Sequence, residues 1–113
     1  MLEINILFVI TIFWTHFFAD FVLQSNKMAI NKSTSSKWLG VHVLVYTAVL
    51  LIFGWKYALV NGVSHFVVDF VTSRLTTYLW KKEERHLFFV VIGFDQAFHL
   101  SCLIATCPLL SIQ

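Results

Sequence analysis

Charged residues are scarce in this sequence of 113 residues. Lys, Arg, Asp and Glu together make up 12% of it, about half the share found in an average soluble domain. Apolar residues make up 58%, and the mean hydropathy is +0.78. This composition excludes a disordered chain and argues against a water-soluble domain. One membrane span needs about 20 apolar residues, so four spans would leave no room for a separate soluble domain.

Cysteine is also scarce, and the net charge is small. Cys102 and Cys107 lie in one apolar run and would face different sides of a helix. They are interpreted as small apolar residues, not as a disulfide or a zinc knuckle. The start, Met1-Leu2-Glu3, lacks the positive charge of a signal peptide, so we expect the first apolar segment to be retained. A net charge of +2, dispersed along the chain, predicts no nucleic-acid partner.

Four apolar segments predict an all-α, polytopic membrane protein with a single domain, residues 1–113. The segments are long and lack the alternation of strands, and four segments cannot close a barrel. Between the first two we expect a loop with one amphipathic turn around Met28. The predicted spans are residues 4–23, 38–55, 57–73 and 87–110, and the predicted cytoplasmic loops are residues 24–37 and 74–86.

The basic residues predict the orientation. The positive-inside rule places the loops with most Lys and Arg in the cytoplasm. Lys56 is the one basic residue on the opposite side. Both termini are therefore expected outside the cytoplasm. The cytoplasmic set comprises Lys27, Lys32, Lys37, Arg74, Lys81, Lys82 and Arg85.

The sequence contains an internal repeat. Residues 16–22, His-Phe-Phe-Ala-Asp-Phe-Val, match residues 65–71, His-Phe-Val-Val-Asp-Phe-Val, and a fainter match relates residues 39–46 to 92–99. We therefore expect two helical hairpins in tandem, as a parallel repeat about an axis along the membrane normal.

Seven ionisable residues lie inside the predicted spans, where they are costly and therefore candidates for function. Six of them form three His/Asp pairs four residues apart, which places each pair on one helix face. In each pair the Asp lies nearer the cytoplasm. A layer of carboxylates, with His42, is therefore expected above a layer of histidines. The seven residues are His16, Asp20, His42, His65, Asp69, Asp95 and His99.

Imidazoles and carboxylates together suit zinc, manganese or iron. All seven residues are candidate ligands, enough for one or two divalent ions, and Asp20, Asp69 and Asp95 are also candidate catalytic groups. A structural network of Asp–His pairs and a proton or ion relay are the alternatives. Gln24 and Ser73, one turn beyond two of the aspartates, are candidates for the mouth of the site. His86 is expected to be a solvated residue in the charged loop.

The motifs resemble a known family. Its pattern is seen in His16-Phe-Phe-Ala-Asp20-Phe-Val-Leu-Gln24, in Asn61-Gly-Val-Ser-His65-Phe-Val-Val-Asp69, and in Asp95-Gln96-Ala-Phe-His99 together with His42. They resemble the small bacterial and phage membrane proteins called domain of unknown function 3307. The resemblance covers nearly the whole chain and implies a bacterial inner membrane, but no activity. A looser similarity to inner-membrane proteins described as metal-dependent hydrolases favours hydrolysis by analogy.

Three functions remain open from the sequence. The first is a metal-dependent hydrolase at the cytoplasmic side, in which the ion activates a water. Its substrate would be a phosphorylated compound or a lipid, because basic residues surround the mouth. The second is transport of a metal ion or protons through the same residues. The third is a non-enzymatic regulatory protein of a phage or bacterium. The bilayer is the expected partner, and a homo-oligomer such as a homodimer is compatible with the short chain.

Overall fold

The protein is helical throughout the part that the structure describes. The computed structural model describes residues 5–110, so both ends of the predicted domain and the first residue of the first predicted span lie outside it. No strand occurs in residues 5–110, and the all-α prediction is confirmed. In chain order the elements are α1 (Ile6–Phe17), a π-helical turn η1 (Phe18–Val22), α2 (Asn26–Asn31), α3 (Ser36–Leu50), η2 (Leu51–Phe53), α4 (Trp55–Lys81), α5 (Arg85–Ala105) and η3 (Cys107–Leu109).

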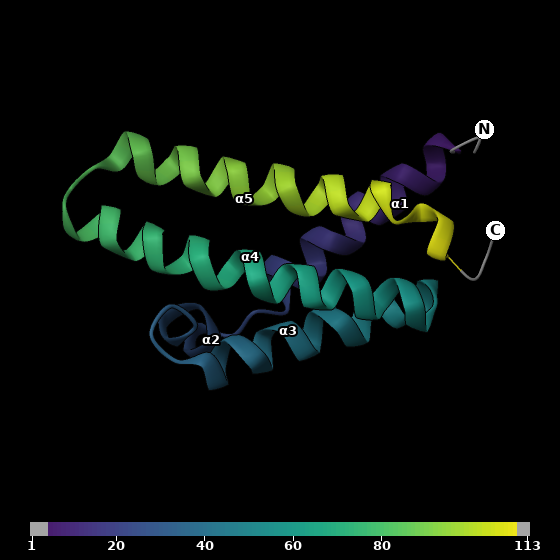
Figure 1. Ribbon diagram of the computed structural model, residues 1–113, viewed down its shortest axis with the longest axis horizontal. Coiled ribbons are helices and arrows are strands. Elements are labelled where there is room, and N and C mark those ends of the chain that lie inside the picture. The colour runs from purple at the N-terminus through teal and green to yellow at the C-terminus, as the bar shows by residue number, and fades with distance from the viewer. Residues whose placement is uncertain (1–4, 111–113) are drawn as a thin grey trace.

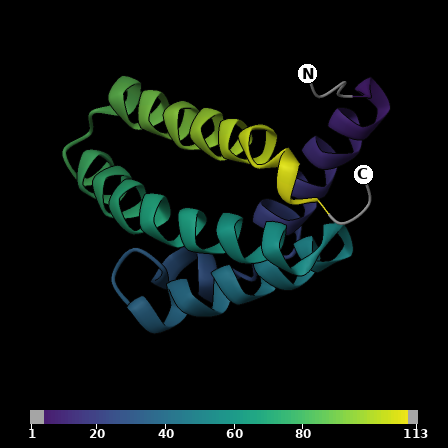
Figure 2. The same cartoon turned by 45° about the vertical axis from the view of Figure 1, so that its right-hand side comes forward.

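Three helices lie side by side, and α1 crosses them obliquely (Figures 1 and 2). Helix α4 is central and packs against both α3 and α5, while α1 contacts α3 and α5. Figure 1 shows α2 and the α4–α5 turn toward one end of the bundle, here called the α2 end. The α3–α4 connection, the start of α1 and η3 lie toward the other. The two connections that carry most of the basic residues therefore lie at the same end.

Local sequence signals account for where several helices begin. Side chains of Asn5, Ser25 and Ser35 accept hydrogen bonds from backbone N–H groups in the first turns of α1, α2 and α3. Such caps satisfy donors that have no partner within the helix. The sharp turn into α4 is made by Gly54, whose φ of 122° is a conformation that glycine adopts without a steric penalty.

Helix α4 is longer than the third predicted span, residues 57–73. It continues to Lys81, so most of the predicted loop 74–86 is helical and residues 82–84 connect it to α5. Of the charged side chains that suggested a loop, Arg74 and Lys81 lie on α4, while Lys82, Glu83 and Glu84 form the short connection. The guanidinium of Arg74 lies 3.7 Å from the ring centre of Phe70 one turn earlier. His86 is exposed, as expected, but it stands in the first turn of α5.

Two helices are long and apolar enough to cross a membrane among residues 5–110. They are the segments Ser36–Phe53 and Arg85–Ala105, and only 28% and 17% of their apolar windows are buried. The apolar segment Ile6–Val22 is shorter. Helix α4 has the length, but polar residues such as Asn61 and His65 on its buried face lower its hydropathy. Length and composition thus identify two spans, where the sequence predicted four.

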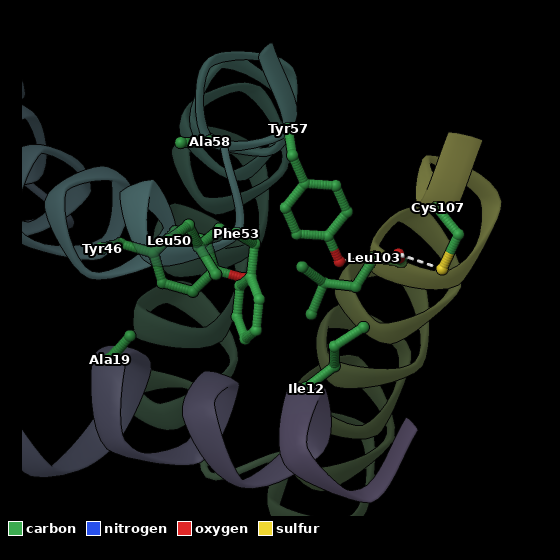
Figure 3. Packing of buried hydrophobic residues seen from close by; sticks show 9 residues of the cluster. All are labelled: Ile12, Ala19, Tyr46, Leu50, Phe53, Tyr57, Ala58, Leu103 and Cys107. Atoms are coloured by element: carbon green, nitrogen blue, oxygen red, sulfur yellow. Dashed lines mark hydrogen bonds between the residues drawn. The ribbon is translucent and has the colours of Figure 1, made fainter. Parts of the chain in front are cut away.

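The apolar core extends from the polar cluster, where Tyr46 contacts His16 and His65, to the start of α4 and the end of α5, and Figure 3 shows its buried residues. Tyr57 is fully buried there, and its hydroxyl donates a hydrogen bond to the carbonyl oxygen of Leu103 at 2.8 Å. The core joins α1, α3, α4 and α5 and borders the His/Asp cluster through Ala19 and Tyr46. Its buried members are Ile12, Ala19, Tyr46, Leu50, Phe53, Tyr57, Ala58, Leu103 and Cys107.

Candidate metal centre

All seven ionisable residues singled out in the sequence are buried, and none is more than 8% exposed. They come from α1, η1, α3, α4 and α5, so the site is assembled from segments far apart in the chain. Within each of the three His/Asp pairs, the closest nitrogen and oxygen are 3.3 to 3.7 Å apart. The spacing of four residues therefore places each His beside its Asp, as predicted.

Four of these residues bring one ligand atom each to within 4.8 Å of one another. We call Asp20, His42, His65 and Asp69 the four-residue group. The Nε2 atom of His42 lies 3.0 Å from Asp20 Oδ1, 3.0 Å from His65 Nε2 and 3.6 Å from Asp69 Oδ2. The Nε2 atom of His65 lies 3.3 Å from Asp20 Oδ1 and 3.6 Å from Asp69 Oδ2.

These distances fit ligands that share one metal ion. Nitrogen and oxygen ligands lie about 2.1 Å from zinc, which places the corners of a tetrahedron about 3.4 Å apart. The distances of 3.0 to 3.6 Å within the four-residue group are close to that value. The Nδ1 atom of His42 has no hydrogen-bond partner among the described residues, so this ring makes its polar contacts through Nε2. Two imidazoles and two carboxylates also form a donor set suited to zinc, iron or manganese.

A second group shares one residue with the first. Asp20, Asp95 and His99 also bring ligand atoms together. His99 Nε2 lies 3.3 Å from Asp95 Oδ2 and 3.7 Å from Asp69 Oδ1. The His65 ring stacks on Tyr46 and lies against His99, with ring centres 4.1 Å apart in both contacts. The two groups are therefore parts of one continuous cluster.

A contact between His65 and His99 limits whether the two groups could each hold an ion at the same time. The Nδ1 atoms of His65 and His99 are 3.3 Å apart, so one hydrogen lies between them. If neutral His65 presents a bare Nε2 to an ion, its Nδ1–H donates to His99. The ring of His99 then carries its hydrogen on Nε2, which faces the carboxylate of Asp95. Metal-bound histidines commonly donate their second N–H in this way. This arrangement makes His99 and Asp95 supporting groups for an ion in the four-residue group.

His16 belongs to neither group, and both of its ring nitrogens are hydrogen-bonded. Gln96 donates through Nε2 to Asp20 and Asp95, at 3.1 Å in each case. Its Oε1 is therefore the acceptor for His16 Nε2 at 2.8 Å. His16 Nδ1 in turn accepts from the hydroxyl of Tyr46 at 2.9 Å. In this arrangement His16 orients Gln96, and its role as a ligand stays a prediction.

The carboxylates of α4 and α5 have further partners. Thr72 Oγ1 donates to Asp95 Oδ1 at 2.5 Å. Lys32, just after α2, reaches into the site, and its Nζ lies 3.2 Å from Asp69 Oδ2. That ammonium group is partly exposed, with 20% of the side chain accessible. Within the described residues, Lys32 is the Lys or Arg side chain that pairs with a carboxylate of the buried cluster.

A π-helical turn positions Asp20. In η1 the backbone N–H of Leu23 donates to the carbonyl oxygen of Phe18, five residues earlier, at 2.9 Å. Such turns are rare and often occur at functional sites. His16 and Asp20 therefore stand across a junction between α-helix and π-helix, whereas His65 and Asp69 stand within regular α-helix. The two matching motifs differ in local geometry, and the internal repeat stays a prediction.

A cavity of about 330 Å³ lies on the carboxylate side of the cluster. Its lining includes Asp20, Asp69 and Asp95 but none of the four histidines of the cluster. The carboxylates therefore lie nearer the cavity than the histidines do, which agrees with the predicted order of layers. His42 does not follow this order, because the sequence placed it in the carboxylate layer and it does not line the cavity. Gln24 and Ser73 line the cavity, as proposed for the mouth, together with Phe21, Ala29, Lys32, Thr72, Thr76, Phe88, Ile92 and Gln96.

Four residues of the site were not identified as site residues from the sequence, and one of them, Lys32, had been assigned only to the basic loop. Tyr46 lies four residues after His42, and Thr72 lies three after Asp69, so both continue a face that already carried a candidate. Gln96 lies next to Asp95 and gives no such signal, because a neighbouring residue in a helix points elsewhere. Its position becomes clear only when α1 and α5 are placed together.

Comparison with known proteins identifies the family. No curated protein and no solved structure matches the chain, and nothing in the comparisons supports the looser similarity to hydrolases. A family model described as "Protein of unknown function (DUF3307)" matches residues 7–112. The chain, with its buried His/Asp cluster, therefore belongs to the DUF3307 family.

Proposed function

We propose that this protein is a membrane-embedded, metal-dependent hydrolase with one divalent ion in the four-residue group. The observation that carries the proposal is the convergence of two imidazole nitrogens and two carboxylate oxygens, with five distances of 3.0 to 3.6 Å among them. Such a buried set of acceptors is costly without a cation to balance it. An ion at this point would stabilise the arrangement.

The cavity supports hydrolysis over a purely structural ion. Asp20 and Asp69 would each be an ion ligand and also line the cavity, so a water there could reach the ion. A bound divalent ion lowers the pKa of such a water and makes it a nucleophile. Asp95 lies in the cavity wall outside the four-residue group and is held by Thr72 and Gln96. We assign it the role of general base.

The apolar core argues against transport through the bundle. The cavity is reached from the α2 side, through residues such as Gln24 and Lys32. Beyond the histidines, the apolar core around Tyr57 and Leu103 occupies the described part of the bundle (Figure 3), and the buried Asn61 there is hydrogen-bonded to Tyr57 and Thr106. A site that is open on one side and closed on the other suits a reaction better than the passage of ions.

The membrane setting is part of the proposal. Large apolar side chains are exposed on each of the four long helices, for example Trp14 on α1, Leu44 on α3, Val63 on α4 and Phe94 on α5, all more than half exposed. Water does not favour so much exposed apolar surface, whereas lipid does. The longest dimension of the molecule, 45 Å, is close to the full thickness of a bilayer. We therefore propose that all four long helices span the bilayer, and that α4 does so because its exposed face is apolar.

Metal content and activity test the proposal together. We expect about one zinc, manganese or iron ion per purified chain by elemental analysis, because the four-residue group provides a single set of ligands. We expect the loaded protein to release nitrophenol from an ester panel (carboxyl esters, phosphate monoesters and phosphate diesters), and a chelator to abolish the release. A well-folded, metal-free protein would reject the metal site. A metal-loaded protein that releases no nitrophenol would support the metal site but reject the hydrolase activity.

The orientation gives an independent prediction. Basic residues concentrate at the α2 end, which the positive-inside rule assigns to the cytoplasm. An alkaline phosphatase domain, active only outside the cytoplasm, should therefore be active when fused after Gln113 and inactive when inserted in the connection at residues 82–84. The reverse pattern would place the cavity on the outer face of the membrane.

A further inference from the structure

The lining of the cavity contains two polar groups that lack hydrogen-bond partners, beside the aspartates of the cluster. Ser73 is 7% exposed, and its Oγ has no hydrogen-bond partner among the described residues, although it faces the cavity. The Oε1 atom of Gln24, also in the lining, lacks a partner too. Buried polar atoms are rarely left unpaired. Both groups therefore point to a polar ligand that enters the cavity.

The charges in the lining determine which ligand this can be. Three aspartates and Lys32 give the lining a formal charge of minus two. One divalent ion in the four-residue group would bring that charge to zero. Both positive groups would then meet at the same carboxylate, because Asp69 belongs to the four-residue group and also pairs with Lys32 at 3.2 Å. An anionic oxygen group could contact the ion and the ammonium together.

From this juxtaposition we propose that the cavity binds a phosphate monoester, with its phosphoryl group between the ion and Lys32 and with Ser73 as a hydrogen-bond donor to it. The inference rests on the proposed metal site and names the substrate class for it. Lys32 is then a recognition residue, which exchanges its contact with Asp69 for one with the phosphoryl oxygens. Lysine is a common point-charge ligand for phosphate in proteins.

The apolar part of the lining indicates where the rest of the ester lies. Phe21 on η1, with Phe88 and Ile92 on α5, contributes apolar walls. Phe21 is 46% exposed, so this wall continues to the outer surface of the bundle, which faces lipid in the proposed setting. A phosphate monoester with acyl chains could therefore enter from the bilayer, while a soluble ester would use the same phosphoryl contacts.

Substitution of Lys32 tests the assignment, because phosphate binding should weaken while manganese binding should not. In the full chain reconstituted in phosphatidylcholine nanodiscs and loaded with manganese, we expect Lys32→Met to weaken inorganic phosphate binding by about tenfold or more. Manganese affinity should stay equal or rise, because the ammonium no longer competes for Asp69. Ser73→Ala should weaken phosphate binding without changing manganese content. Lys27→Met, an exposed lysine of α2 outside the lining, is the matched control and should change neither.

Calorimetric titration with two probes separates the possible sources of the phosphoryl group. Dihexanoyl phosphatidic acid that binds more tightly than inorganic phosphate would support a lipid ester, and equal affinities would support a soluble one. Manganese-loaded wild type that binds neither probe would overturn the phosphate site and leave the metal site standing. Loss of manganese and phosphate together in Lys32→Met would also overturn it, because Lys32 would then be structural. Failure of the metal site itself would appear separately, as wild type that retains no manganese.

Discussion

Replacing His65 with alanine should remove the proposed metal ion, whereas replacing His99 with alanine should only weaken its binding. His65 provides Nε2 to the four-residue group, and His99 supports it through the contact between the two Nδ1 atoms. Loss of a supporting partner typically lowers metal affinity by about 10- to 100-fold, and loss of a ligand should cost more. Competition of the purified variants against a chelator of known affinity, with elemental analysis at saturation, measures both effects.

Two further variants make this comparison secure. Asp69→Asn keeps the shape of the side chain but removes a charged ligand, so it should lose the ion even where His65→Ala unfolds. His86→Ala changes an exposed residue of α5 and should bind like wild type. Two ions per wild-type chain, falling to one in His99→Ala, would contradict the single-ion proposal and favour a two-metal site bridged by Asp20.

Substitution of Gly62 by alanine should destabilise the contact between α3 and α4 by about 1–3 kcal/mol. A Cβ atom at this position would overlap Thr47 Oγ1 and would lie 3.3 Å from Thr47 Cβ and Cγ2. The hydroxyl cannot move freely, because it donates to the carbonyl oxygen of Val43 at 2.7 Å. The clash should outweigh the gain in helix propensity, which is about 1 kcal/mol. Thermal unfolding in detergent measures the difference.

The same helix pair provides the control for the glycine. A Cβ atom at Gly40 meets no atom within 4 Å, so Gly40→Ala should be neutral or stabilising by up to about 1 kcal/mol. Thr47→Ala removes the overlapping hydroxyl and should restore stability in the double variant with Gly62→Ala. Equal destabilisation by both glycine substitutions would show that helix propensity or detergent, not the α3–α4 contact, controls unfolding.

Spacing along the helices was enough to predict the seven ionisable residues that the structure buries together, but not their separate roles and not the partners Tyr46, Thr72 and Gln96. A shared face is a local property, so the pairing of His65 with Asp69 follows from the sequence alone. The role of His16 depends on Gln96 from α5, 80 residues away, and no periodicity within α1 reports that contact. The contact between His65 and His99, which favours one ion over two, likewise joins separate helices.

Hydropathy predicted the fold class but not the extent of each helix. Residues 74–81 looked like a loop because they carry charge, yet they contain neither glycine nor proline and continue α4 as its exposed end. In the same helix, polar residues on the buried face lower the mean hydropathy without ending the helix. Mean values over a window combine the two faces of a helix, and only packing separates them.

The π-helical turn at Phe18–Val22 has a consequence for how this protein tolerates insertions and deletions. A turn of this kind holds one residue more than the α-helical turn it replaces, and the extra residue lies where Asp20 enters the four-residue group. Deleting a single residue within it would restore a regular helix and rotate the chain on one side by about 100° relative to the other. Asp20 or His16 would then leave the site. Variants of this protein with insertions or deletions should therefore carry them elsewhere, for example at residues 82–84, while the π-helical turn keeps its length.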